Sequence, residues 1–417
     1  MKQRFAVLIF LTAVSFTTLT SAQTIPPQFF GMHDFSPYTW PTMENIQFSS
    51  WRSAPVSVQW KDLNPSEGQY DFSQLDTWLS DTQQYGQSML YTVYYTPSWA
   101  SQCPTCACLK GGRRTDGGCY PPNDVASDGS GTDQHLIDFI TALMQHVGPG
   151  KIKYLEVWNE PNITLEYEGT MQQLVRMAKD INQTAKKYDP AIKISGPPET
   201  GDGPVSKDSV EMNWLTKFFA AGGGQWIDTV GLHGYVNPAE DIVTRVDNTK
   251  AAMQQYGQSG KPIFVTEGSW AGGVKFPTKQ QPGFSFRQYL LMLSSSVQKF
   301  YLMAFFDIGA GNLWDSSSKK MNAAGTAYQL YYGWLVGATM TQPCQAQSSN
   351  SPVWSCNFTR SGGYQAEAIW NTAMTWGQTS NITIPSTYTQ YRDLYNHVYQ
   401  IKNHTVPIGY DPIWLEN

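Results

Sequence analysis

Short apolar runs of strand length alternate with longer amphipathic segments over most of this 417-residue chain. Three amphipathic patterns, at 72–85, 135–147 and 167–188, predict helices, and Asp71 is the expected N-cap of the first. Eight strands that alternate with helices favour an α/β fold, a parallel (β/α)8 TIM barrel. A count of seven or nine strands also fits the pattern. The apolar runs cover residues 29–33, 50–58, 88–95, 152–159, 192–196, 227–235, 262–267 and 300–306.

The pattern changes after about residue 340, where short alternating β-rich segments replace the helical periods. These segments predict a small C-terminal antiparallel β domain at 341–417, packed on a catalytic barrel at 23–340. A purely structural role is the simplest interpretation of this domain.

The first 22 residues predict a secretory signal peptide. Lys2 and Arg4 precede an apolar run, and the small residues Ser21 and Ala22 precede Gln23. That run is too short to cross a bilayer, and no later stretch approaches about 20 apolar residues. We therefore expect a secreted protein, extracellular or periplasmic, with no membrane association after the signal is cleaved.

The six cysteines fit an oxidising compartment. Cys344 and Cys356 bracket a polar turn and are expected to form one disulfide. The other four lie between residues 103 and 119, and their pairing stays open, except that Cys106 with Cys108 is sterically awkward. Zinc is the alternative for these four, although their spacing matches no regular zinc pattern.

The composition excludes several classes of protein. Charged residues make up 15% of the chain, below the roughly 25% typical of soluble domains, which argues against a disordered or coiled-coil protein. A net charge of −5 leaves no basic footprint for nucleic acid. The 14% of aromatic residues suits a protein that grips neutral, ring-shaped ligands, and it equally suits a large core with exposed tryptophans.

Two glutamates follow predicted strands and carry the candidate chemistry. Glu160 stands in Val157-Trp-Asn-Glu-Pro-Asn162, and Glu267 ends Phe264-Val-Thr-Glu267. Polar residues at the carboxyl ends of barrel strands face the active-site mouth, so both carboxyl groups can converge there. Glycoside hydrolysis requires such a pair, in which one protonated carboxyl serves the leaving oxygen and one ionised carboxyl attacks the sugar.

These motifs resemble the acid/base and nucleophile motifs of clan A retaining glycoside hydrolases. The segment 64–72 is similar to the segment after the second strand in several of those families, and the likeness is nearest to glycoside hydrolase family 39 and its relatives. The resemblance implies Glu160 as acid/base and Glu267 as nucleophile, a carbohydrate substrate, and neither a metal nor another cofactor. It indicates nothing about the sugar or the oligomeric state.

The resemblance also implies roles for neighbouring positions. Asn159 would bind the sugar 2-hydroxyl, and Arg52 would hold the nucleophile ionised. His233 and Tyr235 resemble the clan's His/Tyr pair beside the nucleophile, and His33 is a similar candidate at the first strand.

Aromatic and charged residues near strand ends are further candidates. Trp99 and Trp270, with Trp314, follow strands and could stack on sugar faces. The eighth strand ends in Asp307 without an obvious Trp platform. The long loop at 103–119 carries Arg113 and Arg114, which could meet an acidic sugar or could simply be solvated.

Three other functions remain open. A barrel that binds carbohydrate without catalysis would be expected to have lost one of the two glutamates, whereas a transglycosylase would use the same residues. A metal-dependent hydrolase would use the cysteine cluster.

Overall fold

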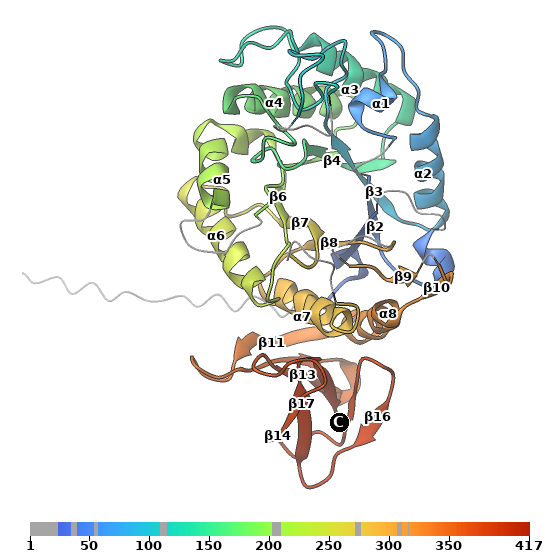
Figure 1. Ribbon diagram of the computed structural model, residues 1–417, viewed down its shortest axis with the longest axis vertical. Coiled ribbons are helices and arrows are strands. Elements are labelled where there is room, and N and C mark those ends of the chain that lie inside the picture. The colour runs from blue at the N-terminus through green and yellow to red at the C-terminus, as the bar shows by residue number, and fades with distance from the viewer. Residues whose placement is uncertain are drawn as a thin grey trace, which may run out of the picture.

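Eight parallel strands form a ring at the centre of the protein (Figure 1). The computed structural model describes residues 24–34, 40–53, 57–108, 115–201, 210–271, 277–306, 311–315 and 317–417. The strands of the ring are β1 (Phe30–His33), β2 (Ser50–Ser53), β3 (Ser88–Val93), β4 (Ile152–Val157), β5 (Lys193–Ser195), β6 (Val230–His233), β7 (Ile263–Gly268) and β8 (Lys299–Met303). Their order is β5-β4-β3-β2-β1-β8-β7-β6, and isolated parallel bridges from Ser195 to Thr229 and from Glu199 to Leu232 join the two ends. The predicted TIM barrel is confirmed.

Helices surround the ring of strands (Figure 1). They are α1 (Trp60–Leu63), α2 (Ser73–Gln84), α3 (Gln134–Val147), α4 (Met171–Tyr188), α5 (Val210–Ala220), α6 (Asp241–Gln255), α7 (Gln281–Ser294) and α8 (Ala323–Leu335).

Two predicted helix starts are wrong, each for a local reason. Phe72 rather than Asp71 occupies the N-cap of α2, and Oδ1 of Asp71 accepts a hydrogen bond from the Ser73 amide at 3.0 Å. The helix expected from residue 167 begins only at Met171, because Thr170 and Gln173 form a capping box there. Residues 158–170 are thereby left as a loop above β4.

The interior of the barrel differs in polarity between its two ends. Near the amino ends of the strands, Leu90, Phe264 and Tyr301 form a buried apolar cluster with Tyr154 packed against it. Lys299, at the amino end of β8, lies buried over the rings of Tyr154 and Tyr301. The carboxyl ends carry a larger set of buried charged and polar side chains, which includes Arg52, His233 and Glu267. The packed end closes the barrel, so a ligand can enter only at the polar end.

The C-terminal part of the chain is antiparallel, as predicted. A six-stranded sheet has the order β11 (Thr339–Ala346), β12 (Val353–Thr359), β13 (Gln365–Asn371), β18 (Ile413–Glu416), β15 (Gln390–Arg392), β16 (Val398–Gln400), and β14 (Thr379–Thr383) pairs with β17 (Thr405–Gly409). A short hairpin of β9 (Trp314–Asp315) and β10 (Lys320–Met321) precedes α8.

The C-terminal sheets lie beside α7 and α8 (Figure 1). Trp414 stacks on Trp334 of α8 with ring centroids 5.6 Å apart, and the Trp370 indole donates a hydrogen bond to Glu240 at 2.8 Å. Buried aromatic contacts of this kind fix the β domain against the barrel.

Three disulfides use all six cysteines: Cys103–Cys106, Cys108–Cys119 and Cys344–Cys356. The Cys344–Cys356 prediction is confirmed. The zinc alternative for the other four is wrong, because every thiolate it requires is consumed in a disulfide. Disulfides of this number are typical of extracellular or periplasmic proteins.

In the part of the chain that the structure describes, no helix is long and apolar enough to span a bilayer. The predicted signal peptide lies outside the described residues.

Candidate active site

Glu160 and Glu267 lie together at the polar end of the barrel. Glu160 follows β4 and Glu267 belongs to β7, and their side chains are 16% and 10% exposed. One carboxylate oxygen from each lies within 4.8 Å of the other. Two strands that are distant in sequence therefore bring two carboxyl groups within reach of one small molecule.

Two hydrogen-bond donors and two histidine rings surround Glu267. Nη1 of Arg52 lies 2.5 Å from its Oε1, and the Tyr235 hydroxyl donates to its Oε2 at 2.7 Å. Nε2 of His33 lies 3.5 Å from Oε1, and Nδ1 of His233 lies 3.5 Å from Oε2. Burial by itself raises the pKa of the Glu267 carboxyl, but the charges of His233 and Arg52, with the donors around them, outweigh it and lower the pKa to about 2. Glu267 is therefore ionised at neutral pH.

Arg52 is fully buried and has three acceptors. Besides Glu267, its Nε donates to Oε2 of Glu156 at 2.7 Å and its Nη2 donates to Oδ1 of Asn159 at 2.8 Å. Thr92 donates a further hydrogen bond to Glu156 at 2.9 Å. These contacts fix the guanidinium, and its fixed charge in turn orients Glu267.

Glu156 was missed by the sequence analysis. Its signal was a carboxyl group inside an apolar strand, two residues after Tyr154 and therefore on the same inward side. A buried carboxylate is expensive unless it is paired, so its presence there predicts a buried cation.

Glu160 is hydrogen-bonded to His233. Nδ1 of the fully buried His233 ring lies 2.6 Å from Oε1 of Glu160, and a proton can be shared at this contact. Trp158 and Glu160 have φ angles of 61° and 42°, in the left-handed region that side chains with a Cβ rarely adopt. Such strain is common at functional sites, where the surrounding structure enforces it.

The two remaining titratable rings are uncharged near neutral pH. Burial, with Arg52 and His233 nearby, lowers the pKa of His33 to about 4 despite the opposing charge of Glu267. Burial and the neighbouring carboxylates raise the pKa of Tyr235 well above its usual value. Tyr235 therefore stays a hydrogen-bond donor to Glu267.

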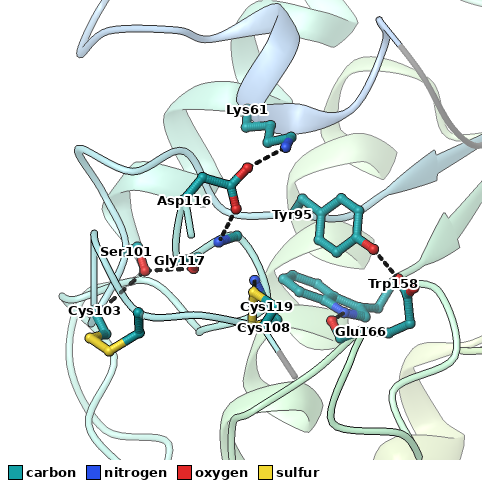
Figure 2. The surroundings of a disulfide bond; sticks show 12 residues. Lys61, Tyr95, Ser101, Cys103, Cys108, Asp116, Gly117, Cys119, Trp158 and Glu166 are labelled. Atoms are coloured by element: carbon teal, nitrogen blue, oxygen red, sulfur yellow. Dashed lines mark hydrogen bonds and ion pairs between the residues drawn. A yellow bond between two sulfur atoms is a disulfide. The ribbon is translucent and has the colours of Figure 1, made fainter. Parts of the chain in front are cut away.

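A disulfide-bonded loop supports the segment after Glu160 (Figure 2). The Tyr95 hydroxyl donates to the Glu166 carboxylate, and the Trp158 indole donates to the Glu166 carbonyl at 2.7 Å. The Glu168 amide donates to the carbonyl of Cys119 at 2.8 Å, and Cys119 is bonded to Cys108. The loop thus contacts the segment after Glu160 at Glu168, and Glu166 of the same segment is tied to Trp158, two residues before Glu160.

Removal of this disulfide is expected to lower both stability and activity. The double variant Cys108→Ser/Cys119→Ser loses the constraint on a short loop, about 3 kcal/mol of the free energy of unfolding. It also loosens the support of Glu160, and we expect a decrease in kcat of about tenfold or more, since small misplacements of reacting groups are costly. Denaturant unfolding and steady-state kinetics measure the two effects.

The matched control is Cys344→Ser/Cys356→Ser, which removes a disulfide that joins β11 to β12 and closes a loop of similar length. It should lose similar stability and keep its kcat. Equal losses of kcat in both double variants would contradict a specific role for the Cys108–Cys119 loop.

The predicted site residues divide into two groups. Arg52, Asn159, His233, Tyr235 and His33 contact Glu267 or Glu160 directly or through one another. The tryptophans do not share these contacts.

Trp99 donates to the Asn64 carbonyl at 2.9 Å and lines a different pocket, with His135 and Asp138 of α3. Trp270, three residues after Glu267, packs edge-on against Phe284 at 5.4 Å. Trp314 is buried against Phe305. Asp307, Arg113 and Arg114 lie outside the described residues.

The same carboxylates and His233 form the one cluster with metal-ligand spacing that occurs among the described residues. Nδ1 of His233 is already hydrogen-bonded to Glu160 at 2.6 Å, so these two ligand atoms are partnered by each other.

Comparisons with known proteins agree with this geometry. Residues 129–328, which include both glutamates, match the family model described as "Glycosyl hydrolase catalytic core". The protein carries the catalytic core of a glycosidase. A search of curated protein sequences finds no match.

Solved structures of glycoside hydrolases share the fold of this glycosidase. A family 39 glycoside hydrolase from Bacteroides cellulosilyticus WH2 is 17% identical with a TM-score of 0.69, over 94% of this chain and 80% of its own. A monomeric β-xylosidase from Caulobacter crescentus CB15 is 14% identical with a TM-score of 0.63, over 95% and 98%. A family 30 subfamily 8 xylanase from Clostridium acetobutylicum is 13% identical with a TM-score of 0.60, over 95% and 96%. The expected likeness to family 39 is thus confirmed in the fold.

Proposed function

We propose that this protein is a secreted retaining glycosidase that cleaves O-glycosidic bonds of an oligo- or polysaccharide, with Glu160 as acid/base and Glu267 as nucleophile. The observation that carries the proposal is the proximity of the two carboxyl groups, since one oxygen of Glu160 and one of Glu267 lie within 4.8 Å of each other. Retaining glycosidases hold their carboxyl groups about 5–5.5 Å apart, whereas inverting enzymes leave about 6.5–9.5 Å for a water molecule. The disulfides and the basic, apolar N-terminal segment support secretion.

The reaction proceeds in two displacements. An oxygen of Glu267 attacks the anomeric carbon, the bond to the leaving oxygen breaks, and the proton of Glu160 passes to that oxygen. In the second step Glu160 takes a proton from water, the water oxygen attacks the anomeric carbon, and the ester to Glu267 breaks. Two inversions give net retention, and Glu160 ends protonated as it began.

The neighbouring side chains hold the pair in the required states. Arg52 and Tyr235 keep Glu267 ionised, and His233 provides Glu160 with a partner for its proton. Because Oδ1 of Asn159 accepts from Arg52, the Asn159 amide nitrogen is oriented to donate to the sugar 2-hydroxyl. That hydrogen bond strengthens as charge develops on the ring.

The xylosidase and the xylanase among the similar structures make xylan the first substrate class to test. Proton NMR of the anomeric region during hydrolysis of xylan fragments and aryl glycosides measures the configuration of the first product. We expect retention. Net inversion would overturn the nucleophile role of Glu267, and binding without turnover would favour a non-catalytic carbohydrate-binding barrel. Product analysis at high acceptor concentration separates hydrolysis from transglycosylation by the same residues.

Replacement of Tyr235 by Phe tests the support of the nucleophile. The variant loses a hydrogen bond to a charged group, worth about 1.5–3 kcal/mol, so kcat should fall roughly 10- to 100-fold. The pKa of Glu267 should rise from about 2, and the acid limb of the kcat/KM profile should move to higher pH. A pH profile from about 2 to 8 measures both effects.

The lowered pKa of Glu267 also makes the free energy of unfolding depend on pH. A carboxyl whose folded pKa is depressed stabilises the folded state above its unfolded pKa, and this contribution disappears as pH falls through the folded value. The stabilisation by Glu267 is therefore complete above about pH 4.5 and is lost progressively as the pH falls from there to about 2.

Tyr91→Phe is the matched control for Tyr235→Phe, because the Tyr91 hydroxyl donates to the Val58 carbonyl, remote from Glu267. An unmoved acid limb in Tyr235→Phe would contradict the role given to Tyr235.

A further inference from the structure

A pocket of about 300 Å³ opens in the C-terminal β domain, and its lining includes neither Glu160 nor Glu267. Its walls come from the turn before β14, from β15 and β16, and from the segment between β17 and β18. Trp376, Tyr395 and Tyr399 line it and are 38%, 40% and 41% exposed. They are three of the five large apolar side chains that are exposed in the described part of the chain. Clustered exposed apolar side chains mark binding sites, whereas single ones need no explanation.

The aromatic rings of the pocket are fixed. Tyr391 and Tyr399 are opposite each other in the β15–β16 pair and stack with centroids 4.8 Å apart. Nζ of Lys279 lies 5.0 Å from the ring of Trp376, and the Arg287 guanidinium lies 4.7 Å from the ring of Tyr410. Rings held in this way lose little conformational entropy when a ligand stacks on them.

Carboxylates complete the lining. Oδ2 of Asp393 accepts from the Tyr399 hydroxyl at 3.3 Å, and Oδ2 of Asp411 accepts from the Tyr395 hydroxyl at 3.2 Å. These carboxylates disfavour an anionic ligand. They can also accept hydrogen bonds from a ligand that has several hydroxyl groups. A neutral sugar ring has apolar C–H faces for the aromatic rings and a rim of hydroxyls for the carboxylates.

The pocket borders the catalytic side of the barrel. A Cβ on Gly283 would lie 2.1 Å from Oδ1 of Asp411, so only glycine permits the close approach of α7 to the pocket. Lys279 and Gly283 stand at the N-terminal end of α7, which follows β7 and therefore lies at the end of the barrel where Glu267 emerges. Phe284, the next residue, packs on Trp270, which follows Glu267 by three residues.

We infer that this pocket is a second carbohydrate site, which binds a neutral sugar unit of the polymer that the barrel cleaves. The choice of a carbohydrate rests on the proposed function. A second contact with one polymer chain raises the effective concentration of the chain at the catalytic mouth without changing the chemistry there.

Native gels that contain a soluble polysaccharide test the inference with the full-length protein. The probes are arabinoxylan, xyloglucan and mixed-linkage β-glucan, with polygalacturonate as the anionic polymer. We expect at least one neutral polymer to retard the protein and polygalacturonate to have no effect. Trp376→Ala and Tyr399→Ala should each weaken the retardation about tenfold and raise KM for that polymer. Both should leave kcat/KM for a small aryl glycoside within twofold.

Val398→Ala is the matched control, since Val398 is exposed on β16 next to Tyr399 and does not line the pocket. Three results would overturn the inference: no retardation by any neutral polymer, unchanged retardation in both aromatic variants, or equal loss in Val398→Ala. A dimer that becomes monomeric in the aromatic variants would also overturn it, because the pocket would then be an interface between copies.

Failure of the proposed function gives a different result. In that case retardation would depend on Trp376 and Tyr399 while no glycoside is cleaved. If instead glycosides are cleaved and the aromatic variants behave as wild type, the result supports the proposed function and refutes the second carbohydrate site.

Discussion

Glu267→Ala is expected to abolish turnover, with a decrease in kcat of about 10⁴-fold or more, as loss of a nucleophile commonly causes. Glu267 is the carboxylate on which Arg52, Tyr235 and two histidines converge. Without it no covalent intermediate can form, however well the sugar binds. Steady-state kinetics on an aryl glycoside measures the loss, and calorimetry with an oligosaccharide checks that binding persists.

Azide distinguishes a lost nucleophile from a damaged site. In Glu267→Ala a small anion can occupy the vacated space and attack the anomeric carbon directly. That single displacement should give a glycosyl azide whose anomeric configuration is opposite to that of the substrate. Glu267→Gln serves as the isosteric variant, in case Ala leaves Arg52 insufficiently paired to fold. Unchanged hydrolysis in both variants would refute the assignment.

Glu160→Ala is expected to have the second-largest effect, and the effect should depend on the leaving group. General acid catalysis contributes about 10²- to 10⁴-fold, so kcat/KM for an oligosaccharide should fall by this amount. A dinitrophenyl glycoside needs no protonation of its leaving oxygen, so its first step should be nearly unaffected. Its second step slows instead, because water loses its base, and the glycosyl-enzyme should accumulate.

Azide again identifies the role of Glu160. With the base removed, azide needs no deprotonation and should restore turnover to give a glycosyl azide of retained configuration. Glu168→Gln is the matched control for Glu160, since Glu168 is an exposed glutamate in the same loop. Equal losses of kcat/KM for good and poor leaving groups would contradict the acid/base role.

The fold was largely predictable from the sequence because each barrel strand is a buried apolar run bounded by polar turns. The first residues of α2 and α4 were predicted wrongly. They depend on the side-chain conformations that make the Thr170 cap and the Asp71–Ser73 hydrogen bond. Glu160 and Glu267 were predictable because strand ends in a barrel share one edge. Glu156 was overlooked, although a lone carboxyl in an apolar strand was visible.

The sequence by itself determined the alternation of strands and helices, the two strand-end glutamates and the even number of cysteines. These are local patterns, set by periodicity and by neighbours along the chain. Only the tertiary structure decided which cysteines pair, that Arg52 joins Glu156, Asn159 and Glu267, and that Trp99 faces another pocket. Such contacts join residues far apart in sequence, and their energies depend on burial and distance, which exist only once the barrel has closed.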